Sequence, residues 1–138
     1  MSGKQVRLNK IFRGDGKAVV VAMDHASGMG PLPGIENPEN VLQKIVAGGA
    51  DAMLTTAGII GRFGDKLPRM GLILRADGGS TSLGTKGGMG KLFGADMALS
   101  LGADAICTMG FAGPDNEYDC WTYVAELSQE CQARQLPY

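Results

Sequence analysis

Short runs of small and β-branched apolar residues recur along this chain, and polar side chains follow each run. The first run covers residues 18–23, and Asp24 and His25 come directly after it. A continuous apolar run of this length predicts a strand buried on both faces, as in a parallel sheet. In parallel α/β folds, the carboxyl ends of the strands converge on one crevice. Asp24 and His25 are therefore the first candidate site residues.

The same pattern predicts three more strands, at 51–56, 69–77 and 103–109. Residues 7–12 predict an amphipathic turn of helix that plugs one end of the sheet. Further helices are predicted from Asn37 to the glycines at 48–49, and over 57–62, 91–101 and 116–134. A fifth strand is expected to begin at 136–138. The side chains expected to face inward from the last helix are Tyr118, Trp121, Val124, Ala125 and Leu127.

Two loops are expected at the carboxyl edge of this sheet. Residues 26–34 are rich in glycine and proline and too long for a simple connection, so they are a candidate substrate loop or an irregular connector. Residues 78–90 are polar and glycine-rich, which predicts a mobile loop over the same edge. A P-loop is rejected here, because Leu92 follows Gly90-Lys91 and Thr85 stands where the first glycine is required.

An internal repeat indicates the architecture. Residues 49–53 and 102–106 read GADAM and GADAI, and each joins the end of an apolar helix to the start of an apolar strand. Their separation equals two βα units of the size found in βα barrels. The predicted fold class is α/β, a (βα)8 TIM-barrel type with about four units, or half a barrel, over residues 1–138. The rival fold is a flavodoxin-like open sheet.

Composition narrows the class of partner. The chain has 138 residues, enough for one domain, and its 13 basic and 14 acidic residues give a net charge of −1. This balance disfavours nucleic acid and membrane surfaces as partners and favours a small molecule. Three cysteines without metal-ligand spacing predict reduced thiols in a cytoplasmic protein. No apolar signal region or membrane-spanning run is apparent.

Each candidate polar residue has two interpretations. Asp24 could orient a substrate hydroxyl, assist proton transfer or pair with a cationic intermediate, or it could cap the following turn. His25, the single histidine, could donate to a phosphate or carbonyl oxygen, or pack structurally. Arg75 could bind phosphate or pair with Asp24 or Asp77. A metal site on Asp24, His25 and Asp77 is disfavoured, because no further ligand pair stands at helical spacing.

Threonines end three of the predicted strands and are weaker candidates. Thr55, Thr56 and Thr108 could line the pocket, although threonine is also a common strand residue.

Motifs along nearly the whole chain carry a family resemblance. They include RLxKIF at 7–12, AMDH at 22–25, Gly30-Pro31, the two GADA segments, LxLR at 72–75 and STSL at 80–83. In this combination the chain resembles the N-terminal half of archaeal-type class I fructose-bisphosphate aldolases, within the DeoC/LacD-like superfamily. It departs at Ala26, where that family has glycine, which puts the first loop in doubt.

The resemblance implies a Schiff-base aldolase of sugar-phosphate metabolism, in glycolysis or gluconeogenesis. Its substrate would be a phosphorylated ketose such as fructose 1,6-bisphosphate, or dihydroxyacetone phosphate, and it would need no cofactor. Asp24 matches an aspartate of that family that assists the chemistry. From their positions at the ends of the strands, His25, Thr56, Arg75 and Asp77 are expected to contact the substrate. The reactive lysine and the acid/base residue would lie beyond Tyr138. The lysines of this chain do not end apolar strands: Lys4, Lys10, Lys17, Lys44, Lys66, Lys86 and Lys91.

A half barrel exposes two sheet edges, so the chain is expected to form a homo-oligomer or to pair with a complementing C-terminal half. The alternatives are a non-catalytic sugar-phosphate-binding or regulatory module, a metal-dependent aldolase, and a related thiolase or transaldolase-like enzyme.

Overall fold

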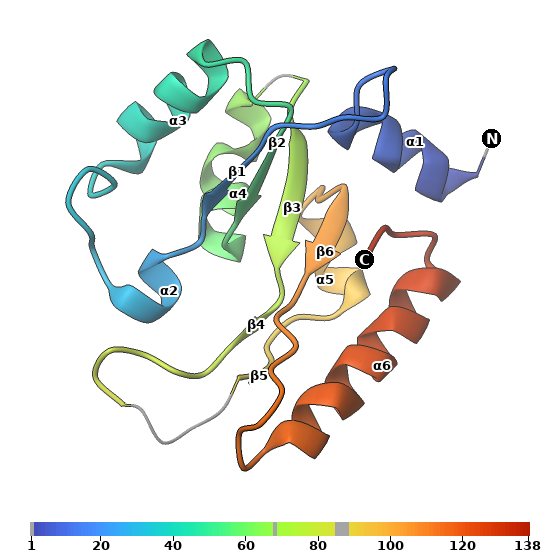
Figure 1. Ribbon diagram of the computed structural model, residues 1–138. Coiled ribbons are helices and arrows are strands. Elements are labelled where there is room, and N and C mark those ends of the chain that lie inside the picture. The colour runs from blue at the N-terminus through green and yellow to red at the C-terminus, as the bar shows by residue number, and fades with distance from the viewer. Residues whose placement is uncertain (1, 68, 85–88) are drawn as a thin grey trace.

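A computed structural model describes residues 2–67, 69–84 and 89–138. Thr85 and Lys86, named above, lie outside the described residues. Figure 1 shows the arrangement of the elements. In chain order they are α1 (Gly3–Ile11), β1 (Val20–Met23), α2 (Ala26–Met29), α3 (Pro38–Ala47), β2 (Ala52–Thr55), α4 (Ala57–Phe63), the 3-10 helix η1 (Gly64–Lys66), β3 (Gly71–Arg75), β4 (Asp77–Gly78), β5 (Gly90–Lys91), α5 (Ala95–Ser100), β6 (Ala105–Cys107) and α6 (Glu117–Ala133).

A four-stranded parallel sheet forms the centre of the fold, with the strand order β1-β2-β3-β6. Successive strands are neighbours and are joined through helices, which is the topology of consecutive βα units. All four strands run in the same direction, so their carboxyl ends meet near α2, β4 and β5 at the lower end of Figure 1. The predicted half barrel of four units is confirmed.

Helices α3 to α6 cover one face of this sheet. Asn37 caps α3 by accepting a hydrogen bond from the Asn40 N–H, and Pro38 occupies the first turn, as predicted. The strands and the helices share one apolar core. Its buried side chains include Leu42, Ile45, Met53, Ile60, Leu72, Leu74, Ile106 and Leu127.

The opposite face of the sheet is covered at one end only. Ile11 of α1 packs on Ala52 and Ala105 near the start of the strands, so the plug predicted for 7–12 is observed. Beside this plug the face is open along β1, where Val20 is 45% exposed and Ala22 is also exposed. The expectation that the first strand is buried on both faces is therefore wrong. β1 is an edge strand, and the described residues provide no second layer above it.

The C-terminal residues lie beside β6, as Figure 1 shows. The Ile106 N–H donates a hydrogen bond of 3.0 Å to the Pro137 carbonyl. The Tyr138 hydroxyl shares a hydrogen bond with the Thr108 hydroxyl. The segment 136–138, where a fifth strand was expected to begin, thus contacts the outer edge of β6.

Three element boundaries differ from prediction at the carboxyl edge. The strand predicted at 69–77 ends at Arg75, and Asp77 belongs to a separate antiparallel pair, β4 with β5. Because Lys91 lies in β5, the helix predicted from 91 begins only at Ala95. Residues 26–29, predicted as loop, form the short helix α2. Ala26 starts this helix, in a conformation that requires no glycine.

The inward face of α6 is also different from the prediction. Its buried side chains are Cys120, Tyr123, Leu127 and Cys131, so only Leu127 of the five predicted residues is buried. Tyr118 is 82% exposed, and Trp121 packs on Gly110 in the preceding loop while remaining partly exposed. The buried face follows the helical spacing of positions 120, 123, 127 and 131, which Tyr118 and Trp121 do not share.

Among the residues that the structure describes, none of the helices is long and apolar enough to cross a lipid bilayer.

The two GADA segments form equivalent structures. Asp51 exchanges two hydrogen bonds with the backbone of Val19, and Asp104 exchanges two with the backbone of Leu72. Each aspartate also pairs with a cation from the N-terminal region: Asp51 with Arg13 at 2.6 Å, and Asp104 with Lys10 at 2.8 Å. At both copies of the repeat, the aspartate therefore bonds the segment that leads into one strand to the neighbouring strand.

Replacing Asp104 with alanine is expected to lower the free energy of unfolding by about 1–3 kcal/mol, because the buried Leu72 N–H loses its carboxylate acceptor. Urea denaturation followed by circular dichroism measures this loss. Asp96→Ala is the matched control, because its ion pair with Arg134 is largely exposed and should contribute much less. Equal losses in the two variants would contradict the role of Asp104.

Candidate active site

The polar residues that follow the strands meet at the carboxyl edge of the sheet. Asp24 follows β1, Arg75 ends β3 and Asp77 opens β4. The two loops predicted over this edge touch one another, because the Ser82 N–H donates to the Gly28 carbonyl at 2.8 Å. Parallel strands with matched ends bring these segments together although they are far apart in the sequence.

Arg75 lies between two carboxylates. Its Nη1 donates to Asp24 Oδ2 at 2.7 Å, and its Nε donates to Asp77 Oδ1. The three side chains are 14%, 10% and 0% exposed, respectively. Of the two interpretations of Arg75, the structure shows the pairing, and with both aspartates at once.

This arrangement keeps the arginine charged. Burial lowers the pKa of Arg75, but the hydrogen bond and the charge of Asp77, followed by those of Asp24, outweigh it and raise the pKa above its ordinary value. A permanent cation therefore faces Asp24 Oδ2. The other carboxylate oxygen of Asp24, Oδ1, has no hydrogen-bond partner among the described residues. Because every buried side-chain oxygen that the structure describes has a partner, Oδ1 is accessible to solvent. It is the free acceptor of this cluster.

Asp77 has two further partners, and one of them, Tyr123, was not among the candidate residues of the sequence analysis. Its Oδ2 accepts hydrogen bonds from the Met109 N–H at 2.7 Å and from the Tyr123 hydroxyl at 3.2 Å. Tyr123 comes from the buried face of α6. A helical period through Cys120, Tyr123 and Leu127 was the signal in the sequence that could have identified it.

Two of the three candidate threonines, Thr55 and Thr56, form hydrogen bonds with the backbone. Thr55 is fully buried, and its hydroxyl donates to the Met23 carbonyl at 3.0 Å, so the expectation that it lines the pocket is wrong. Its side chain is on the helix-facing side of β2, which the strand alternation determines. Thr56 caps α4 by accepting a hydrogen bond from the Ile59 N–H at 3.4 Å. Its predicted contact with substrate stays a prediction.

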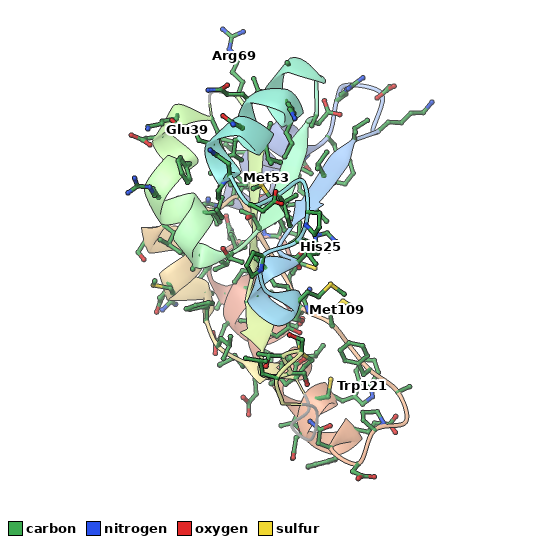
Figure 2. All side chains as sticks on the ribbon, turned by 90° about the vertical axis from the view of Figure 1, so that its left-hand side faces the viewer. His25, Glu39, Met53, Arg69, Met109 and Trp121 are labelled. Carbon is green, nitrogen blue, oxygen red and sulfur yellow. The ribbon has the colours of Figure 1, made fainter. Side chains whose placement is uncertain are left out.

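His25 is exposed at the start of α2. Its imidazole has no hydrogen-bond partner among the described side chains and backbone groups, which does not match a packing histidine. Figure 2 shows the side chains of His25, Met109 and Trp121 along the same side of the molecule, from the end of β1 toward the start of α6. His25 is thus accessible beside Asp24, and its role in substrate binding stays a prediction.

The cluster offers neither a metal site nor a thiolate nucleophile in the described part of the chain. The Arg75 guanidinium occupies the space between Asp24 and Asp77, and no group of three potential ligands occurs among the described residues. Cys107 pairs with Arg75 in the strand register. Burial raises the pKa of the Cys107 thiol, and this outweighs the opposing charge of Arg75, so the thiol is neutral at pH 7.

The lysines do not reach this cluster within the described chain. Lys91 pairs with Glu130 on α6 at 2.6 Å, and Lys10 pairs with Asp104 at the opposite end of the sheet. All described lysines are exposed: Lys4, Lys10, Lys17, Lys44, Lys66 and Lys91. A Schiff-base lysine needs a desolvated setting that lowers its pKa, and these positions do not supply one.

Comparisons with known proteins agree with this geometry. An uncharacterized aldolase of Saccharolobus solfataricus is 34% identical over 125 residues, which are 85% of this chain and 46% of that protein. The 2-amino-3,7-dideoxy-D-threo-hept-6-ulosonate synthase of Halobacterium salinarum is 31% identical over 99% of this chain and 51% of its own length. The chain spans about half the length of the curated relatives it matches.

The solved structure of a Schiff-base-forming fructose-1,6-bisphosphate aldolase superposes with a TM-score of 0.83 and 25% identity, over 99% of this chain and 55% of that one. The strands and helices described above therefore correspond to part of an aldolase barrel. The sequence profile of the DeoC/LacD family of aldolases matches residues 18–138, which include every strand and the whole Asp24–Arg75–Asp77 cluster. The chain belongs to the DeoC/LacD aldolase family.

Proposed function

We propose that this chain forms the first half of a class I aldolase that cleaves or condenses a phosphorylated ketose through a Schiff base. The observation that carries the proposal is the Asp24 carboxylate at the carboxyl edge of the sheet, with one oxygen held by Arg75 and the other unpartnered among the described residues. A fixed negative charge at this position can stabilise an iminium intermediate, and the free oxygen can accept a proton or a hydroxyl hydrogen bond.

The reactive lysine is proposed to come from outside this chain. The described lysines are exposed and do not end strands of the parallel sheet, whereas the chemistry requires a desolvated amine next to Asp24. In the proposed step, that amine attacks the ketose carbonyl and water leaves to give the iminium. The iminium then accepts the electron pair of the breaking carbon–carbon bond, while a base removes the hydroxyl proton.

The missing strands are proposed to come from a C-terminal half or from a second copy of the chain. The open face beside Val20 and the free edge of β1 favour such a complement, because an exposed apolar edge strand readily pairs with further strands. The three cysteines are free thiols, which supports the proposal that the assembled enzyme acts in the cytoplasm.

A second candidate reaction is the one named for the Halobacterium relative. It is favoured by that relative's 31% identity, against 25% for the structurally compared fructose-1,6-bisphosphate aldolase. Both candidate reactions belong to enzymes similar to this chain, and they differ in the ketose on which the enzyme acts.

Borohydride trapping tests the proposal. The chain is incubated with fructose 1,6-bisphosphate or dihydroxyacetone phosphate, alone and joined to the second half of the compared aldolase, and then reduced. We expect the 14.4 kDa chain to stay unmodified and the joined protein to gain one adduct by intact mass. An adduct on the chain alone would show that one of its own lysines reacts, and no adduct on the joined protein would overturn the aldolase proposal. Adduct formation with the heptulosonate alone would favour the second candidate.

A further inference from the structure

We propose that Tyr123 is a positioning residue for Asp24 and acts on it through Asp77 and Arg75. The inference rests on the proposed function, because it concerns the carboxylate assigned to the reaction. It adds a residue from α6, in the fourth βα unit, to a site whose reacting group follows the first strand.

The first step is the fixed position of the Tyr123 hydroxyl. This hydroxyl is buried and lies between two acceptors, the Met109 carbonyl at 2.7 Å and Asp77 Oδ2 at 3.2 Å. The Cys120 thiol donates to it at 3.5 Å. Burial, the hydrogen bond with Cys120 and the charge of Asp77 raise the pKa of Tyr123 well above its ordinary value. The hydroxyl therefore keeps its single proton, which it shares as a donor between the Met109 carbonyl and Asp77 Oδ2.

The second step is the orientation of the Asp77 carboxylate. The Met109 N–H and the Tyr123 hydroxyl both lie within hydrogen-bonding distance of Oδ2, which leaves Oδ1 directed at Arg75 Nε. The side chain of Asp77 is fully buried, so water cannot replace these donors. Without the tyrosine hydroxyl, one donor remains on Oδ2 and the carboxylate has more freedom to rotate.

The third step transfers this orientation to Asp24. The guanidinium group is planar, so fixing Nε also fixes the direction of Nη1. Nη1 donates to Asp24 Oδ2 at 2.7 Å, and Oδ1 of Asp24 is left for the substrate. The Thr55 hydroxyl holds the carbonyl of the preceding residue, Met23, at 3.0 Å. The backbone before Asp24 and one of its two carboxylate oxygens are thereby both fixed, as preorganised catalysis requires.

Nuclear magnetic resonance of the 138-residue chain tests this inference without any need for activity. Tyr123→Phe removes the hydroxyl and keeps the ring. We expect it to speed the hydrogen exchange of Arg75 Nε–H about fivefold, relative to the backbone amides of β2, the effect of losing one hydrogen bond. We also expect it to move the carboxyl ¹³C signal of Asp24. Tyr118→Phe is the matched control, because Tyr118 is exposed, and it should change neither signal.

Unchanged Arg75 exchange and an unchanged Asp24 signal in folded Tyr123→Phe would overturn the inference. If that variant does not fold, the wild-type chain still decides: a scalar coupling across the hydrogen bond from the Tyr123 hydroxyl proton to the Asp77 carboxyl carbon supports the contact with Asp77, and a coupling to the Met109 carbonyl carbon alone contradicts it. These signals do not depend on turnover. If the wild-type chain shows these signals but the joined protein gives no adduct on borohydride trapping, the proposed function is refuted and the positioning role of Tyr123 is kept.

Discussion

Replacing Arg75 with methionine is expected to lower the free energy of unfolding by about 3–5 kcal/mol, the cost of removing one partner from a buried ion pair. Methionine fills a similar volume, but it leaves the carboxylates of Asp24 and Asp77 close together without a cation. Asp77 is fully buried, so solvent cannot compensate its charge. Urea denaturation at pH 7 measures the loss.

The loss should also depend on pH. Protonation of an unpaired buried carboxyl removes its charge, so folded Arg75→Met takes up protons in mild acid that the unfolded chain does not yet bind. Its free energy of unfolding should then rise as the pH falls from 7 toward 5. Wild type should not share this rise, because the raised pKa of Arg75 keeps the cation present at both pH values.

Two variants make this test specific. Arg62→Met is the matched control, because Arg62 is exposed and its guanidinium carbon lies 5.6 Å from the centroid of the Phe63 ring, with no ion pair in the described structure. It should cost well under about 1 kcal/mol. Adding Asp24→Asn and Asp77→Asn to Arg75→Met should recover part of the lost stability. A single Arg75→Met variant as stable as Arg62→Met would show that the cation is not needed.

The sequence was sufficient to predict the order of the elements and the edge at which the polar residues meet. A strand that ends in a charged residue places that residue at a common edge when all strands are parallel, which is why Asp24 and Arg75 could be assigned to one site. The GADA repeat likewise predicted two equivalent junctions, and both are observed at Asp51 and Asp104. Local pattern was enough for these features because they depend on strand direction alone.

Burial and side-chain partners were not predictable in the same way. Val20 is a β-branched apolar residue of the kind found in protein cores. Because β1 is an edge strand with no second layer among the described residues, the Val20 side chain is exposed. The helical period of α6 marks Tyr123 as a buried residue, but no local feature of the sequence reveals that its partner is a carboxylate 46 positions away. The two interpretations of Arg75 differed only in its spatial neighbours, which a single sequence does not specify.

The exposed face beside β1 connects the fold to the proposed reaction. A parallel sheet buries both faces in complete α/β proteins, whereas here the cover on one face, among the described residues, is the small cluster around Ile11 near the start of the strands. The open portion lies next to Asp24, Arg75 and the accessible His25. The same absence of cover therefore leaves room for further strands and for the lysine that the proposed chemistry needs.

Replacing Asp24 with asparagine in the joined barrel, this chain followed by the second half of the compared aldolase, is expected to lower turnover by about 10²–10⁴-fold. Asparagine keeps the shape and can still accept the hydrogen bond from Arg75, but it carries no charge to stabilise the iminium and is a poor proton acceptor. Steady-state cleavage of fructose 1,6-bisphosphate measures the loss. Thermal unfolding of the same variant should confirm that it remains folded.

The control for Asp24→Asn is Asp119→Asn, which removes an exposed carboxylate on α6 that has no partner among the described residues. It should leave turnover unchanged. Borohydride trapping then separates the steps: an adduct that still forms in Asp24→Asn while cleavage is lost would place Asp24 after carbonyl attack, at the charge of the iminium. Near-normal cleavage by folded Asp24→Asn would remove Asp24 from the mechanism and leave its pairing with Arg75 as a structural feature of the half barrel.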